Sequence, residues 1–161
     1  MAKKKDKGPK SLVPSAVEKH PVSIQQVNRS KIPQTKYSDD VMKMTPSWRV
    51  TLLQVADPWG WHNLNADELR SVHTRLREYE AKTWSHILIN ECYRNHRIEC
   101  HKLCKDARER LSELHLDDLE QLISLRLSSR ERVWGILENN VLSLLWWDPE
   151  HLVYPVFKHN T

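Results

Sequence analysis

The sequence predicts an α+β domain in which two helices pack on one face of a small, mostly antiparallel sheet. Apolar residues recur at helical spacing from about residue 65 to residue 114, and strand-like stretches flank this region on both sides. The last strands follow one another through short turns, which is typical of an antiparallel meander. The order of one strand, two helices and a meander of about three strands therefore favours helices and sheet in separate layers.

The first 45 residues are predicted to form a disordered basic arm in front of this domain. They carry ten Lys and Arg side chains against four acidic ones, with scattered prolines and no sustained hydrophobic period. Such a segment buries too little apolar surface to offset the entropy of ordering, so that it is either a solvated tail or an interaction arm. The domain is expected over residues 46–161, where fifteen basic side chains meet seventeen acidic ones.

The first strand and the first helix of the domain are predicted from local signals. Residues Ser47–Val55 have the composition of a strand, and Asp57–Asn63 is expected to be a loop because it contains proline and glycine. Asn65 is a candidate helix N-cap, since Glu68 stands at the capping-box spacing. The helix is expected to reach Cys92 or Tyr93, and six residues form its apolar face: Leu69, Val72, Leu76, Tyr79, Thr83 and Ile87.

A second helix and the meander complete the predicted domain. After a break at residues 95–99, one helical face collects Leu103, Ala107, Leu111 and Leu114. Residues Ile123–Leu127 and Arg132–Leu137 are predicted strands, followed by a tight turn at residues 138–140 because asparagine tolerates positive φ. The strand Val141–Trp147 is apolar on both faces and is therefore expected to be central, and Pro149 ends it.

Composition and motifs exclude several classes of protein. Charged residues make up 29% of the chain, mean hydropathy is −0.67, and no apolar run reaches the roughly 18–20 residues of a membrane span. We therefore expect no membrane partner. The lysine-rich start lacks the apolar core of a secretory signal, and three cysteines argue against a disulfide framework, so that a cytoplasmic location is expected. No nucleotide-binding, serine-hydrolase or zincin motif occurs, and no cofactor is expected.

The C-terminal meander carries the residues best suited to chemistry. Arg126 ends one predicted strand, Arg132 opens the next, and His151 follows the last one within Asp148-Pro149-Glu150-His151. Antiparallel pairing brings the start of one strand beside the end of its neighbour, so that these three side chains are expected at one edge of the sheet. Arginine holds phosphate and histidine transfers protons near neutral pH. We predict that the three share a solvent-open cleft within reach of one phosphate.

This layout resembles the C-terminal half of the RelE/ParE superfamily of toxins, most closely the YoeB-like, ribosome-dependent mRNA endonucleases. Two arginines six residues apart, a hairpin and a strand ending on His and Tyr carry the resemblance, and the ending RVWGI…LLWWDPEH is similar to that of an uncharacterised bacterial family. The resemblance implies a toxin-like endoribonuclease that cleaves mRNA on the ribosome, in a toxin–antitoxin or phage-defence setting. Its implied catalytic residues are Arg132 for the phosphate, His151 as general acid and Arg126.

The resemblance also implies residues that bind substrate and partners that bind the protein. Arg130, Tyr154 and Trp147 would contact the substrate, with a core position as the alternative for Trp147, and Glu131 or Glu150 could serve as base. RNA or the ribosome is the expected partner, together with an antitoxin that adds a strand or helix at an exposed sheet edge. The alternative function is a catalytically inactive module of the same fold that binds a protein or nucleic acid.

Two further features have simpler structural explanations. Five potential zinc ligands lie within thirteen residues, but no Cys-x2-Cys pair is present, so that packing is favoured over a metal site; they are Cys92, His96, Cys100, His101 and Cys104. Trp59 and Trp61 stand in the loop after the first strand. We favour an aromatic lid over the sheet for these two tryptophans, with a binding rim for a peptide or a base as the alternative.

Overall fold

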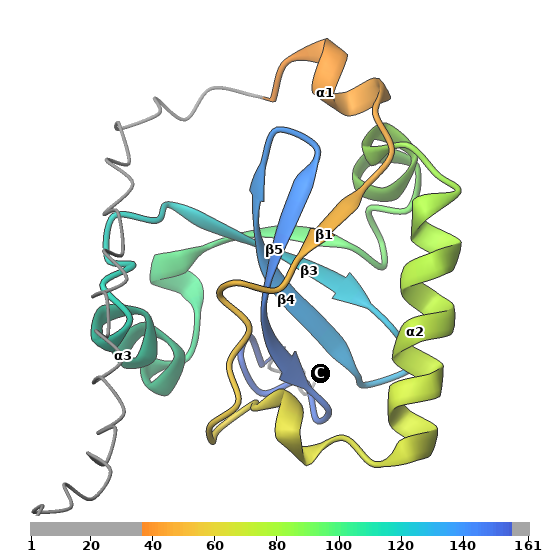
Figure 1. Cartoon of the computed structure of the whole chain (residues 1–161). Helices are drawn as coiled ribbons and strands as arrows, with labels where there is room; N and C mark the ends of the chain where they lie inside the picture. Colours follow the sequence, from red (N-terminus) through yellow and green to blue (C-terminus); the bar gives the residue numbers. More distant parts are fainter. Residues whose placement is uncertain (1–36, 156–161) are drawn as a thin grey trace, which may run out of the picture. The chain divides into compact units, whose positions relative to one another are not determined.

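A mixed, open five-stranded sheet organises the protein, whose computed structural model describes residues 37–155 (Figure 1). The strand order is β1-β5-β4-β3-β2, in which β1 runs parallel to β5 and every other pair is antiparallel. The bounds of the strands are β1 (Ser47–Arg49), β2 (His96–Glu99), β3 (Gln121–Arg126), β4 (Arg132–Glu138) and β5 (Val141–Asp148). The predicted α+β class and the C-terminal meander are confirmed.

The helices of the described residues are short except for one. They are α1 (Asp39–Lys43), α2 (Ala66–Glu80) and α3 (Lys105–Glu113), with a π-helix, η2 (His86–Asn90), and two 3-10 turns, η1 (Trp61–Asn63) and η3 (Cys100–Lys102). The predicted capping box begins α2: the Asn65 side chain accepts from the backbone N–H groups of Asp67 and Glu68, and the Glu68 carboxylate accepts from Asn65 N. Helix α2 ends at Glu80, earlier than predicted.

The two main helices cover opposite faces of the sheet, and the prediction that both pack on one face is wrong. Val72 and Tyr79 of α2 pack with Ile123 and Val133, whereas the residues of α3 pack with the alternate positions of the same strands: Ala107 and Leu111 contact the cluster of Leu122, Trp134 and Ile136. Figure 1 shows α2 and α3 on either side of the meander. The central strands are apolar on both faces, so that each face needs a cover.

An unpredicted strand, β2, explains why the two helices lie on opposite faces of the sheet. Residues 95–99, expected to be a break between the helices, contain β2, which pairs antiparallel with β3 at the edge of the sheet. Because β2 stands between α2 and α3 in the chain, the backbone passes from one face of the sheet to the other there. The first strand, in contrast, is shorter than predicted, since only Ser47–Arg49 of the predicted Ser47–Val55 is paired.

A one-residue bulge in β5 decides which side chains reach each face at the end of the meander. Trp134 pairs with Trp146 but Gly135 pairs with Leu144, so that Leu145 is the extra residue. Beyond the bulge the alternation is reversed. Trp146 therefore lies on the face covered by α3, together with Leu145, while Trp147 joins the core under α2.

The predicted boundary between arm and domain at residue 45 is also wrong. Residues Asp39–Lys43 form α1, with Ser38 as its N-cap, and Met42 is buried in the core beneath α2. The expectation of disorder for residues 1–36 lies outside the described residues, as do the last six residues of the predicted domain.

Gly135 tests the packing at the bulge. A Cβ atom at this position would lie 2.7 Å from the Ser143 carbonyl oxygen and 2.8 Å from Leu142 Cγ. Because one of these neighbours is backbone of the paired strand, Gly135→Ala should lower the free energy of unfolding by about 1–3 kcal/mol. Urea denaturation measures this change, and a Gly135→Ala variant as stable as the wild type would contradict the described register.

Candidate functional site

Arg126, Arg132 and Asp148 form one row across the ends of three strands. Arg126 is paired with Arg132 between β3 and β4, and Arg132 is paired with Asp148 between β4 and β5. Directly paired residues point to the same face of a sheet. All three therefore point to the face that α3 covers, because the next row on that face contains Trp134 and Trp146 of the α3 core. The direct pairing of β3 with β4 thus confirms the prediction that the two arginines meet at one end of the sheet.

Asp148 explains why the most apolar strand ends on Asp-Pro-Glu-His. Its carboxylate is fully buried and accepts hydrogen bonds from Leu152 N at 2.9 Å, from Val153 N at 3.0 Å and from Trp134 Nε1 at 3.4 Å. The carboxylate thus closes a turn in which His151 has a positive φ of 61°. Cys104 N, at the start of α3, donates to Val153 O at 2.9 Å and holds the returning segment on the α3 face. His151 is thereby brought to the arginine row, the part of this row formed by Arg126 and Arg132.

One carboxylate, that of Asp148, lies beside the arginine row and offsets only part of the charge of its two guanidinium groups. Arg132 is only 7% exposed and donates from one Nη to the carbonyls of Ser128 and Glu131, while its buried Nε has no hydrogen-bond partner. Arg126 Nε also donates to Ser128 O, at 2.8 Å. Within residues 37–155 neither guanidinium forms an ion pair with a carboxylate. Like charges on paired positions cost stability, and an anion would remove this cost.

Two histidines border the arginine row. Burial lowers the pKa of His151 from its usual 6.5, and the positive charge of Arg132 lowers it further. Burial and then Arg132 also lower the pKa of His96, the first residue of β2. Both imidazoles are therefore mainly neutral at pH 7 in the free protein. A neutral imidazole can accept a proton as a general base, and the fraction that is protonated can donate one as a general acid.

His96 was missed by the sequence reasoning as a member of this cluster. The sequence placed it only among possible zinc ligands, because residues 95–99 were expected to be a break and not a strand. In β2 His96 pairs with Ser124, two residues before Arg126 and on the same face. A signal was present in the sequence, since His96-Arg97-Ile98-Glu99 contains a β-branched residue between polar ones, but four residues are too few for a period to be assigned.

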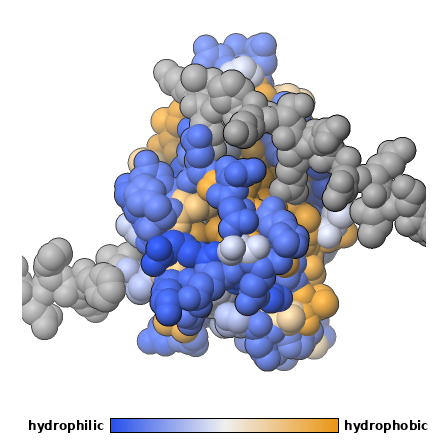
Figure 2. Space-filling model, turned by 90° about the vertical axis from the view of Figure 1, so that its left-hand side faces the viewer, coloured by the Kyte–Doolittle hydropathy of each residue, from blue (hydrophilic) through white to orange (hydrophobic). Residues whose placement is uncertain are grey.

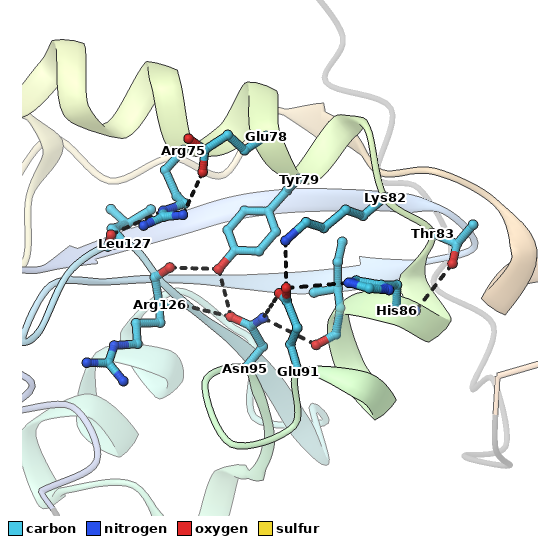
Figure 3. Close-up of polar contacts among 11 residues, drawn as sticks. Arg75, Glu78, Tyr79, Lys82, Thr83, His86, Glu91, Asn95, Arg126 and Leu127 are labelled. Atoms are coloured by element: carbon cyan, nitrogen blue, oxygen red, sulfur yellow. Dashed lines mark hydrogen bonds and ion pairs between the residues drawn. The ribbon is translucent and has the colours of Figure 1, made fainter.

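A buried polar network fixes the backbone of Arg126 (Figure 3). Arg126 N donates to Asn95 Oδ1 at 3.0 Å, and the Tyr79 hydroxyl donates to Arg126 O at 2.7 Å and lies 2.9 Å from Asn95 Oδ1. Burial raises the pKa of Tyr79 to about 12, so that the hydroxyl remains a donor. Asn95 Nδ2 donates to Ile87 O of the π-helix at 3.2 Å. The Arg126 guanidinium points away from this network.

An ion-pair cluster braces the same network from the side of the π-helix. Glu91 accepts from Lys82 Nζ at 2.6 Å, lies 3.5 Å from His86 Nε2, and is 3.5 Å from Asn95 Nδ2. Burial acts to raise the pKa of Glu91, but Lys82 and His86 together hold it below its usual value. Helix α2, the π-helix and the segment before β2 thus all support the position of Arg126.

The residues predicted to bind substrate lie in three different places. Arg130 is exposed and pairs with Glu150 at 2.9 Å, which links the β3–β4 turn to the turn that carries His151. Tyr154 is half-buried and packs against the α3 core. Trp147 is 3% exposed within the α2 core, so that it offers no ring face to a base; the bulge sends it there. The assignment of Trp147 to substrate binding is therefore wrong.

The tryptophan loop and the cysteines take part in packing. Trp59 is buried against Trp146 with ring centroids 5.3 Å apart, and Trp61 packs against the α2 core. Cys100 is buried, which raises its pKa to about 11, and Cys104 precedes α3, whereas Cys92 is exposed. No three His, Cys, Asp or Glu side chains of residues 37–155 gather as a metal-binding group.

Two cavities of the described residues lie away from the arginine row. A cavity of about 500 Å³ is bounded by α1, the π-helix and β2, and His96 is among its lining residues. A second, of about 540 Å³, lies between the 3-10 turn η3, α3 and the start of β3. Arg126, Arg132 and His151 line neither, so that the predicted cleft gains no support from them. Seen from the side of α3, the surface is largely hydrophilic with apolar residues between (Figure 2).

Comparison with protein-family models, with curated proteins and with solved structures gives no match to this chain. Among residues 37–155, no helix has the length and apolar character that crossing a bilayer requires.

The Tyr79 hydroxyl tests the network behind Arg126. Tyr79→Phe removes the donor to Arg126 O and should lower the free energy of unfolding by about 1–3 kcal/mol, because a buried carbonyl loses its partner. Tyr93→Phe is the matched control: Tyr93 is 65% exposed, and its change should remain within about 0.5 kcal/mol. Equal urea-denaturation midpoints for the two variants would contradict the role of the Tyr79 hydroxyl.

Proposed function

We propose that Arg126, Arg132 and the neighbouring histidines bind a phosphate group of RNA, and that the protein is a toxin-like endoribonuclease that cleaves mRNA. One observation carries this proposal: neither of two adjacent guanidinium groups forms an ion pair among residues 37–155, the single carboxylate in their row, that of Asp148, offsets only part of their charge, and the buried Arg132 Nε has no hydrogen-bond partner. Burying an uncompensated charge is costly. A phosphate bridging the two guanidinium groups would offset their remaining charge and accept hydrogen bonds from them.

The chemistry suited to these groups is cleavage by the RNA's own 2′-hydroxyl. The 2′-oxygen attacks phosphorus, the bond to the 5′-oxygen breaks, and the products are a 2′,3′-cyclic phosphate and a 5′-hydroxyl. Arg126 and Arg132 would stabilise the charge that develops on the phosphoryl oxygens. A neutral His151 would accept the proton of the 2′-hydroxyl as general base, a role that differs from the general acid that the resemblance implies.

The resemblance to the RelE/ParE superfamily sets the wider proposal. In it the protein acts on the ribosome, and an antitoxin covers an open sheet edge. Strands β1 and β2 are the outer strands of the sheet, each paired on one side within residues 37–155. Residues 46–161 have no excess of basic side chains, whereas residues 1–45 do, so that the N-terminal segment would supply most of the long-range attraction to RNA.

A catalytically inactive module that binds nucleic acid is the second candidate. Arg132 favours this candidate, since its side chain is only 7% exposed and donates to two backbone carbonyls. A guanidinium group held in this way is a fixed group for binding a ligand. In this case the same cluster would bind phosphate without cleaving RNA.

Sulfate tests whether the cluster binds an anion. Sulfate should raise the melting temperature of the wild type but not that of Arg126→Met, and the sulfate effect should grow from pH 8 to pH 5.5. The sign follows from the lowered pKa values, since His96 and His151 gain a proton, and the cluster a charge, as the pH falls. Arg77→Met, which removes an exposed arginine of α2, is the control for net charge. Equal sulfate effects in the two variants would overturn the anion site.

RNA oligonucleotides separate the two candidate functions. The wild type should cleave RNA to a 2′,3′-cyclic phosphate, should bind but not cleave the 2′-deoxy oligonucleotide, and should lose about tenfold in affinity with Arg126→Met, the equivalent of about 1.4 kcal/mol. Binding without cleavage, free or on ribosomes, would favour the inactive module. Binding that Arg126→Met and Arg77→Met weaken equally would contradict both candidates.

A further inference from the structure

His96 and His151 stand on opposite sides of the arginine row. The strand order from β5 to β2 puts the two arginines between them: His151 follows β5, Arg132 opens β4, Arg126 ends β3, and His96 opens β2. His96 is paired with Ser124, whose row is next to that of Arg126 on the α3 face. Strands β2 and β5 are three strand spacings apart, roughly 14 Å between backbones, which leaves a phosphate on the arginines within reach of side chains from both sides.

The electrostatics agree with this arrangement. Arg132 acts on both imidazoles, and His96 itself contributes to the lowered pKa of His151. The other charged groups that face His151 are Arg126, from β3, and Asp148, from β5, which opposes the arginines. The two histidines therefore belong to one electrostatic cluster, although 55 residues separate them in the chain.

We infer that His96 is the proton donor of the proposed RNA cleavage, acting on the 5′-oxygen while His151 accepts the proton of the 2′-hydroxyl. The inference rests on the proposed endoribonuclease function and assigns the two ends of its proton transfer. In-line displacement at phosphorus places the attacking and leaving oxygens on opposite sides, so that a base and an acid are needed on opposite sides of the phosphate.

The step is balanced with these two groups alone. The 2′-oxygen forms a bond to phosphorus as its proton passes to His151, and the bond from phosphorus to the 5′-oxygen breaks as that oxygen takes a proton from His96. The reaction leaves His151 protonated and His96 neutral, and exchange with water restores both. His96 is exposed to solvent, which allows this exchange.

A substrate that needs no acid separates the two histidines. Cleavage of a natural RNA dinucleotide should fall by about 10²-fold or more in His96→Ala, since a positioned acid contributes about 10²–10⁴-fold. Cleavage of uridine 3′-(4-nitrophenyl phosphate), whose leaving group departs as a stable anion, should be nearly unchanged in His96→Ala. His151→Ala should slow both reactions, and His73→Ala, an exposed histidine of α2, should slow neither.

The pH dependence of kcat/KM provides a second readout. The wild-type profile should be bell-shaped with its maximum below the usual histidine pKa of 6.5, because both free-protein pKa values are lowered. His96→Ala should lose the fall on the alkaline side, where the acid would be deprotonated. His151→Ala should lose the fall on the acid side.

Each remaining outcome counts against His96 in a distinguishable way. If the wild type cleaves RNA and His96→Ala is fully active, or slows both substrates equally, His96 is not the proton donor while the endoribonuclease proposal stands. If the wild type cleaves neither substrate, both proposals fail together.

Discussion

The bulge at Leu145 is the constraint on which the site depends. If β5 were paired regularly, with Leu145 opposite Trp134, Trp147 would lie opposite Arg132 and Asp148 would turn to the α2 face. With the bulge, Asp148 lies in the row of Arg132 and its carboxylate closes the turn that returns His151 to that row. A single local irregularity thus connects the packing of the meander to the position of a histidine that follows the last strand. Bulges often re-aim side chains in this way beside functional sites.

The surroundings of the arginine row hold it firmly and offset only part of its charge, through Asp148. Carbonyl oxygens of the β3–β4 turn accept from Arg126 and Arg132, and Tyr79 and Asn95 fix the Arg126 backbone from the opposite face of the sheet. Such backing restrains the guanidinium groups before any ligand arrives, which lowers the entropy that binding would cost. The Arg130–Glu150 pair, in contrast, is exposed and contributes little to stability.

The fold bears on the resemblance that the sequence suggested. The predicted meander and the pairing of its two arginines are present, whereas helices on opposite faces and the additional strand β2 depart from the expected arrangement of two helices on one face. The proposal of RNA cleavage therefore draws its support from the charge and geometry of Arg126, Arg132, His96 and His151. The proposed ribosome and antitoxin partners come from the resemblance in sequence alone, and these have no separate support in the site.

The sequence by itself determined the α+β class, the capping box at Asn65, the three strands of the meander and the meeting of Arg126 with Arg132, because these follow from local pattern and from the geometry of hairpins. Tertiary structure decided the rest. Strand β2 is too short to have a period, and its pairing depends on β3, more than twenty residues away. The faces of Trp147 and Asp148 depend on a bulge that leaves no mark in hydrophobic periodicity, since β5 is apolar on both faces. His96 joined the site for the same reason: long-range pairing, and not local sequence, put it beside the arginines.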